Sequence, residues 1–106
     1  MINHLDAIFK PKSIAVLGAS SKKGTIGHAI FNNLIRYGYK GKLFPINPKS
    51  ESITGLKCYP TILDTPDKID LAIIVVPRDL MEQAIDECGR KGVSSVIAIT
   101  SGFKEI

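Results

Sequence analysis

Two serines and two lysines, Ser20–Lys23, stand between Gly18 and Gly24, directly after the apolar run SIAVL, and Gly27 follows soon after. Hydroxyls, ammonium groups and free backbone N–H groups at the start of a helix attract anions, because that end of the helix dipole is positive. The loop therefore predicts a phosphate site. Its spacing, G-x5-G-x2-G, matches neither the G-x-G-x-x-G dinucleotide fingerprint nor a P-loop. A plain packing turn remains the alternative.

A second polar turn, FPINPKSE, places Asn47, Pro48 and Lys49 at the end of the next apolar run. NAD-binding folds usually carry an acidic residue at this point, which bonds the ribose hydroxyls. A lysine beside a neutral amide suits a phosphate instead, so NAD is disfavoured and NADP stays open. Asn, Pro and Ser also favour a simple turn, and the residues alone leave that reading open.

Four apolar runs predict the strands that position these loops, and all four look buried on both faces. The runs are Ser13–Leu17, Lys42–Ile46, Asp70–Val76 and Ser95–Thr100. Periodic patterns predict helices over Thr25–Tyr37, stopped by Gly38, and over Leu80–Lys91, stopped by Gly92, with Asp79 and Glu82 as a capping box. The segment Tyr59–Ile69 has room only for a short helix, broken at Pro66.

Strands that alternate with helices indicate an α/β fold, a Rossmann-like doubly wound parallel sheet in a single domain over residues 1–106, with residues 1–12 as an N-terminal arm. We expect the four strands in the order 3-2-1-4, which puts the switch point between the first and the fourth strand. Ligands of such sheets bind outside the carboxyl ends of the strands, where both polar turns are expected.

Composition narrows the class of protein. The chain has 106 residues, 44% of them hydrophobic and 23% charged, and no apolar run long enough to span a membrane. Two cysteines, Cys58 and Cys88, make neither a disulfide framework nor a metal site, and no signal peptide pattern is present, so we expect a cytoplasmic protein. The first fifty residues carry eight of the fourteen basic residues, which favours a polyanionic ligand. Nucleic acid fits poorly, because no aromatic residues are interleaved.

Four motifs, SIAVLGASSKKGTIG, GYKGKLFPINPKSESITGLKCYPTI, DLAIIVVP and GVSSVIAITSGFKE, occur in one order along the chain. Together they resemble the N-terminal CoA-binding domain of NDP-forming acyl-CoA synthetases. These enzymes include the ADP-forming acetyl-CoA synthetases, and the domain is related to the α-subunit of succinyl-CoA synthetase. The resemblance covers nearly the whole chain, from about Ala7 onward.

The resemblance implies a site for coenzyme A spread over four loops. The first loop would hold the CoA phosphates, the second would border the adenosine, and the loops after the third and fourth strands would complete the cleft. Related α-subunits can carry the second-loop lysine one position later, where this chain has Ser50. The residues so implied are Gly18, Ser20, Ser21, Lys22, Lys23, Gly24, Asn47, Pro48, Lys49, Val76, Pro77, Thr100 and Ser101.

Enzymes of this family work through a phosphohistidine in a later ligase domain and through an ATP-grasp module, and neither occurs in these residues. His4 lies in the N-terminal arm, and His28 is expected in a surface or capping role. We therefore expect a CoA-binding module without catalytic residues or metal, part of a longer ADP-forming acetate–CoA ligase. Its partners would be CoA or acyl-CoA and the ligase and ATP-grasp parts, with no nucleic acid and no membrane. The alternatives are an NAD(P)-binding half-domain of an oxidoreductase and a CoA-sensing regulatory module attached to an acetyltransferase.

Overall fold

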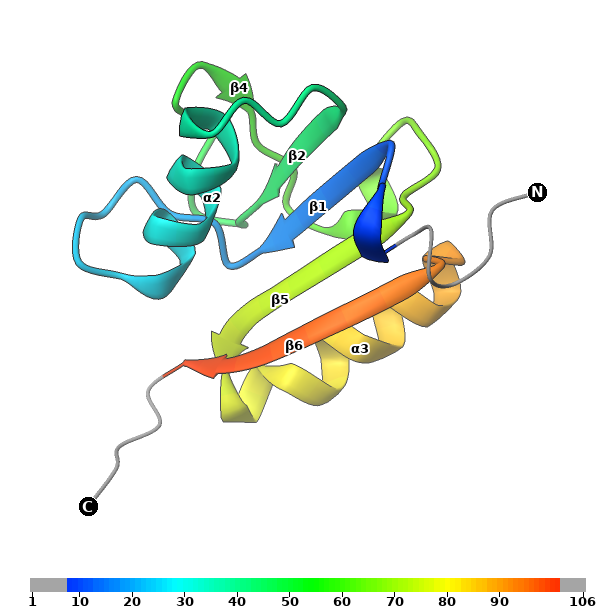
Figure 1. The fold of residues 1–106 in the computed structure, drawn as a ribbon. Coiled ribbons are helices and arrows are strands. Elements are labelled where there is room, and N and C mark those ends of the chain that lie inside the picture. Colours follow the sequence, from blue (N-terminus) through cyan, green and yellow to red (C-terminus); the bar gives the residue numbers. More distant parts are fainter. Residues whose placement is uncertain (1–7, 102–106) are drawn as a thin grey trace.

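The computed structural model describes residues 8–101, of which the side chains of Thr100 and Ser101 are left undescribed (Figure 1). The predicted strands and helices are present with small shifts of their ends. In chain order the elements are β1 (Ser13–Leu17), α2 (Ile26–Arg36), β2 (Lys42–Ile46), β3 (Ser52–Ile53), β4 (Leu56–Lys57), a 3₁₀ helix η1 (Ile62–Asp64), β5 (Leu71–Pro77), α3 (Arg78–Lys91) and β6 (Ser95–Ser101).

The main sheet has four parallel strands in the order β2-β1-β5-β6. The α/β class and the parallel doubly wound sheet are thus confirmed, whereas the predicted order 3-2-1-4 is wrong. The third strand, β5, pairs with β1 and not with the far edge of β2. The switch point therefore lies between β1 and β5, as in the flavodoxin-like order, and not between the first and fourth strands.

Pro45 accounts for the difference in strand order. Its carbonyl accepts a hydrogen bond from the Tyr59 N–H at 3.0 Å on the outer edge of β2. A strand residue directs its N–H and C=O to the same side, so the N–H that proline lacks is missing from this outer edge. A further parallel strand would need that donor, and within residues 8–101 only an isolated bridge between Ile46 and Tyr59 forms there.

Helix α3 covers one face of the main sheet and helix α2 covers the other, and the two helices lie on opposite sides in Figure 1. Ala15 and Leu17 of β1 belong to a buried cluster with Ala84 and Cys88 of α3. Their neighbours Ile14 and Val16 belong to a second cluster that contains Phe31 of α2 and Ile53 of β3. Successive strand residues thus point to opposite faces, and both faces of β1 are buried.

β6 departs from the predicted burial. Its side chains Val96 and Ile97 are 42% and 39% exposed, because β6 is the edge strand of the described sheet and pairs only with β5. The short hairpin β3–β4 was not predicted either. It turns at Thr54 and Gly55, both with positive φ, and it buries Ile53 against the α2 side of the core.

The helix ends follow the sequence signals except at the start of α3. Gly38 and Gly92, with φ of 79° and 81°, end α2 and α3 as predicted. The capping box at Asp79 is wrong, because Pro77 occupies the N-cap position and no side chain caps the helix. β5 runs directly into α3, and Asp79 lies in the first turn, where a negative charge still favours the helix dipole.

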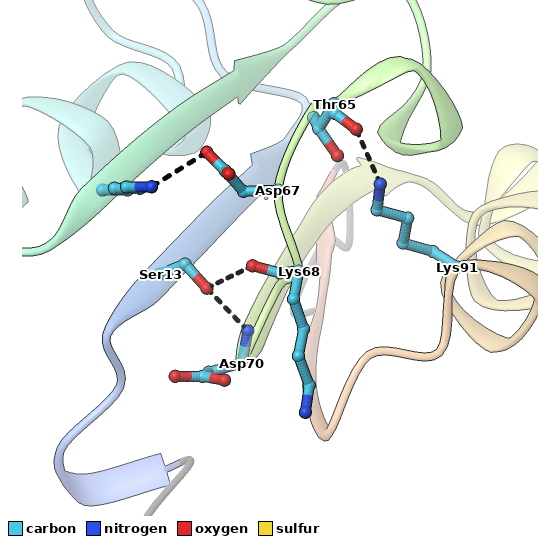
Figure 2. A network of polar contacts seen from close by, with 7 residues as sticks. Ser13, Thr65, Asp67, Lys68, Asp70 and Lys91 are labelled. Atoms are coloured by element: carbon cyan, nitrogen blue, oxygen red, sulfur yellow. Dashed lines mark hydrogen bonds and ion pairs between the residues drawn. The ribbon is translucent and has the colours of Figure 1, made fainter.

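A polar network fastens the amino ends of the strands (Figure 2). The Ser13 hydroxyl donates to the Lys68 carbonyl at 2.7 Å and accepts from the Asp70 N–H at 2.9 Å. Lys91 donates to the Thr65 carbonyl at 2.7 Å, and Lys42 pairs with Asp67 at 3.2 Å. These contacts tie segment 65–70 to β1, β2 and α3, at the opposite end of the sheet from the predicted loops.

Candidate functional site

A cleft of about 830 Å³ opens at the carboxyl ends of β1, β2 and β5, where the switch point lies. Its size falls in the range of pockets for small molecules and cofactors. The lining mixes glycine and polar loop residues with an apolar floor. The lining residues are Leu17, Gly18, Ser20, Gly24, Thr25, Ile26, Gly27, Ile46, Asn47, Pro48, Lys49, Pro60, Thr61, Val75, Val76, Pro77, Leu80, Gln83, Ala84 and Glu87.

Two glycines let the first helix start against the end of the first strand. A Cβ on Gly18 would lie 1.9 Å from the Val75 carbonyl oxygen, and a Cβ on Gly27 would lie 2.0 Å from the Gly18 carbonyl oxygen. Contacts this short do not occur, so a side chain at either position would force the backbone to move. Gly24 differs, because its φ of +92° favours glycine but, apart from its two chain neighbours, none of the described residues has an atom within 4 Å of where its Cβ would be. The space beside Gly24 is open.

The loop between Gly18 and Gly27 is a tight turn that is held by hydrogen bonds from its own side chains. Ser20 Oγ accepts from the Lys22 N–H at 3.0 Å, and the Thr25 hydroxyl donates to the Lys22 carbonyl at 2.8 Å. Thr25 also caps α2 by accepting from the His28 N–H at 3.2 Å. Within residues 8–101, the N–H groups of Lys23, Gly24, Ile26 and Gly27 donate to no acceptor, so they are available to an anion.

Asn47 connects the second loop to the first. Its Nδ2 donates to the Ala19 carbonyl at 2.9 Å, and its Oδ1 accepts from the Lys49 N–H at 2.8 Å. The second contact is an Asx turn, the simple turn that the sequence left open, while the first ties both loops together. The Cys58 thiol donates to the Asn47 carbonyl at 3.5 Å, and burial raises the pKa of this thiol.

Three exposed lysines surround the loops. Lys49 lines the cleft, whereas Ser21, Lys22 and Lys23 belong to the first loop without lining it. None of these lysines forms an ion pair with any residue in the described range 8–101. They therefore contribute positive charge near the cleft without being neutralised by a carboxylate.

The loops after β5 and β6 differ in their relation to the cleft. Val76 and Pro77 line it, at the turn from β5 into α3. Thr100 and Ser101 pair with them across the sheet, Thr100 beside Val76 and Ser101 beside Pro77. The side chains of Thr100 and Ser101, and the loop that follows β6, lie outside the described part of the structure, so their place in the cleft stays a prediction.

Several lining residues were not predicted. They come from three places: the first turn of α2, the segment after β4, and the inner face of α3. With the observed strand order, α3 starts directly at the switch point, so its first turns would have been expected in the cleft. These residues are Thr25, Ile26, Gly27, Pro60, Thr61, Leu80, Gln83, Ala84 and Glu87, and Leu17, Ile46 and Val75 join them from the strand ends.

Other kinds of site find little support among the described residues. No group of three or more His, Cys, Asp or Glu side chains in residues 8–101 could hold a metal ion. No helix in that range is both long and apolar enough to cross a membrane. Cys58 and Cys88 are buried in separate core clusters, and burial raises the pKa of Cys88 to about 11, so its thiol is not a nucleophile at neutral pH.

Comparisons with known proteins identify relatives over nearly the whole chain. A family described as CoA binding domain matches residues 12–105. The ADP-forming acetate–CoA ligase I subunit alpha of Pyrococcus furiosus is 50% identical over 106 residues, which cover 96% of this chain and 23% of that subunit. The ADP-forming acetate–CoA ligase of Methanocaldococcus jannaschii is 48% identical over 102 residues, or 96% of this chain and 14% of that protein.

A solved structure is similar to this chain in both fold and sequence. The dinucleotide-forming acetyl-coenzyme A synthetase 1 of Ca. Korarchaeum cryptofilum, in complex with phosphate and ADP, matches with a TM-score of 0.90 and 50% identity. The match covers 96% of this chain and 22% of that one. The chain thus spans less than a quarter of the length of these relatives. None of the three is named an oxidoreductase or an acetyltransferase, so they favour neither alternative reading.

Proposed function

This chain belongs to the family of CoA-binding domains, and we propose from this premise that its cleft holds the nucleotide end of coenzyme A. The observation that carries the proposal is the cleft itself, which lies at the switch point beside four N–H groups that no acceptor in residues 8–101 engages. CoA carries a pyrophosphate and a ribose 3′-phosphate, and both are anions of the kind that such a loop attracts.

Each loop has a distinct role in this proposal. The first loop, with Gly24 and the start of α2, receives the pyrophosphate through backbone N–H groups, and Lys22 and Lys23 add attraction from the rim. Lys49, which belongs to the second loop, binds the 3′-phosphate. The apolar floor, which includes Ile46 and Leu17, accommodates the adenine ring. Val76, Pro77 and the end of β6 complete the cleft.

The parent protein is, in this proposal, an ADP-forming acetate–CoA ligase, as the names of the relatives suggest. This domain binds and orients CoA, while a ligase part with a phosphorylated histidine and an ATP-grasp part perform the chemistry. The domain by itself does not turn over substrate. We place the protein in the cytoplasm, because its two buried thiols lie in separate clusters, which suits a reducing compartment.

Isothermal titration of the chain with CoA, dephospho-CoA and NADPH tests this proposal. We expect CoA to bind with a Kd below about 1 mM, the level of roughly −4 kcal/mol, and NADPH to bind at least about tenfold more weakly. Lys49→Ala should abolish the preference for CoA over dephospho-CoA. Lys68→Ala, an exposed lysine at the amino ends of the strands, is the matched control and should leave it intact. Absence of CoA binding, or tighter binding of NADPH, would overturn the proposal.

A further inference from the structure

His28, in the first turn of α2, uses both of its ring nitrogens. Nδ1 lies 3.1 Å from the Ser20 carbonyl oxygen, and Nε2 lies 2.9 Å from Nδ2 of Asn32. Because a carbonyl oxygen can only accept, Nδ1 carries the proton and donates to Ser20. Nε2 then accepts from the Asn32 amide, so one neutral tautomer satisfies both contacts.

The carbonyl immediately before that of Ser20 is also held by a side chain. Asn47, from the loop after β2, donates to the Ala19 carbonyl at 2.9 Å. Two consecutive peptide groups of the first loop are therefore fixed from two different elements. Because a trans peptide is planar, with its C=O and N–H directed oppositely, holding the carbonyls of Ala19 and Ser20 also sets the directions of the N–H groups of Ser20 and Ser21. Within residues 8–101 these two N–H groups also donate to no acceptor.

This geometry matters for anion binding. Carbonyl oxygens carry partial negative charge and repel a phosphate, whereas N–H groups attract it. We propose that His28 is a positioning residue of the phosphate-binding loop. By holding the Ser20 carbonyl, it keeps the loop in the conformation that offers N–H groups to a phosphate of CoA. The inference rests on the proposed function, and it assigns His28 no contact with the ligand.

Two observations support a role through the loop and not through direct contact. Ser20 lines the cleft, but His28 is not among its lining residues. Asn32, which orients the His28 ring, is itself approached through its Oδ1 by the Thr54 hydroxyl at 3.5 Å, from the turn of the hairpin β3–β4. The contact that orients the His28 ring, between Nε2 and Asn32, is thus separate from the contact between Nδ1 and Ser20.

Two substitutions separate the donor from the bulk of the ring. His28→Phe keeps a ring but removes the donor, and we expect the Kd for CoA to rise about fivefold to tenfold, as for loss of one hydrogen bond. His28→Asn places an amide nitrogen the same number of bonds from the backbone as Nδ1, and we expect it to stay within about twofold of wild type. Asn33→Ala, an exposed side chain on the same helix, is the matched control and should change nothing.

Rescue by His28→Asn is the result that a purely structural role would not give. If His28→Phe binds CoA as wild type does, or if His28→Asn binds as weakly as His28→Phe, the inference is wrong. Circular dichroism melting shows whether each variant is folded at the titration temperature. If His28→Phe does not fold, the comparison of His28→Asn with His28→Leu serves in its place.

Nitrogen-15 NMR of His28 in the free chain tests the contact without any ligand. We expect the Nδ1–H tautomer, and an Nε2–H tautomer would contradict the inference. This measurement also separates the two claims. A chain with the Nδ1–H tautomer that binds no CoA refutes the proposed function, whereas a chain that binds CoA with the Nε2–H tautomer refutes only the role of His28.

Discussion

Replacing Gly27 by alanine is the sharpest perturbation of the junction between β1 and α2. The added Cβ would lie 2.0 Å from the Gly18 carbonyl oxygen and 3.0 Å from its carbon. Carbon–oxygen contacts are ordinarily about 3.3 Å, so the helix start and the strand end must separate by roughly 1.3 Å. Both sides are backbone, and neither can rotate away.

The expected cost follows from two opposing terms. Alanine gains about 0.5–1 kcal/mol over glycine in a helix interior, while forced overpacking costs about 1–3 kcal/mol. The difference between the two ranges is about 0–2.5 kcal/mol. Because backbone meets backbone at this contact, we expect Gly27→Ala to lower the free energy of unfolding by about 1–2 kcal/mol, and each kcal/mol lowers Tm by about 4–8 °C. CoA binding should weaken at least about tenfold, because the first loop is displaced with the helix.

Gly89 of α3 supplies the matched control. It is also a helical glycine, but apart from its own helix backbone and chain neighbours no atom of residues 8–101 lies within 4 Å of where its Cβ would be. Gly89→Ala should therefore raise the free energy of unfolding by about 0.5–1 kcal/mol and leave CoA binding unchanged. Thermal denaturation and calorimetric titration of both variants test the reasoning. If Gly27→Ala behaves like Gly89→Ala, the close approach of α2 to β1 is not as described.

Three further outcomes are expected. Replacing Lys22 and Lys23 together by alanine should weaken CoA binding by no more than about 1 kcal/mol per charge, because both are exposed, and titration at low and high salt should show a flatter salt dependence than wild type. Burial raises the pKa of Cys88 from about 9.0 to about 11, which favours the folded state while the thiol is protonated. Denaturant titrations should show this stabilisation in full below pH 9 and its loss between pH 9 and 11. The unfolding free energy of Cys88→Ala should lack this dependence on pH. Ser13→Ala leaves the part-buried Lys68 carbonyl and the buried Asp70 N–H without the hydroxyl, and it should cost about 1–3 kcal/mol of unfolding free energy. CoA binding should stay unchanged; weakened binding would show that the two ends of the sheet are coupled.

The elements were readable from the sequence because their signals are local. Apolar runs marked β1, β5 and β6, and Gly38 and Gly92 marked the ends of the helices. Strand order is not a local property, because an apolar run does not show which other strand it pairs with. Pro45 is an exception, because a proline whose missing N–H faces outward belongs on an edge strand. That orientation becomes visible only once the pairing of β2 is known.

The candidate site likewise contains residues that local signals identify and residues that depend on the strand order. The glycine loop and the turn at Asn47 were found from residue types, and eight of the implied residues line the cleft. The contribution of α3, through Gln83 and Glu87, depends on the strand order and was missed with it. The contacts of Asn47 and His28 with the loop carbonyls join residues far apart or on different turns, so no spacing rule could predict them.

The most direct test of the central claim is a titration of the nitrogen-15-labelled chain with CoA, followed through its backbone amide resonances. The account predicts that the largest saturable shifts occur at the loop and helix start, at Lys23, Gly24, Ile26 and Gly27, whose N–H groups have no acceptor in residues 8–101. Pyrophosphate alone should shift the same amides at higher concentration. If the largest shifts instead fall at the amino ends of the strands, near Ser13, or on the exposed edge of β6, CoA does not bind in this cleft.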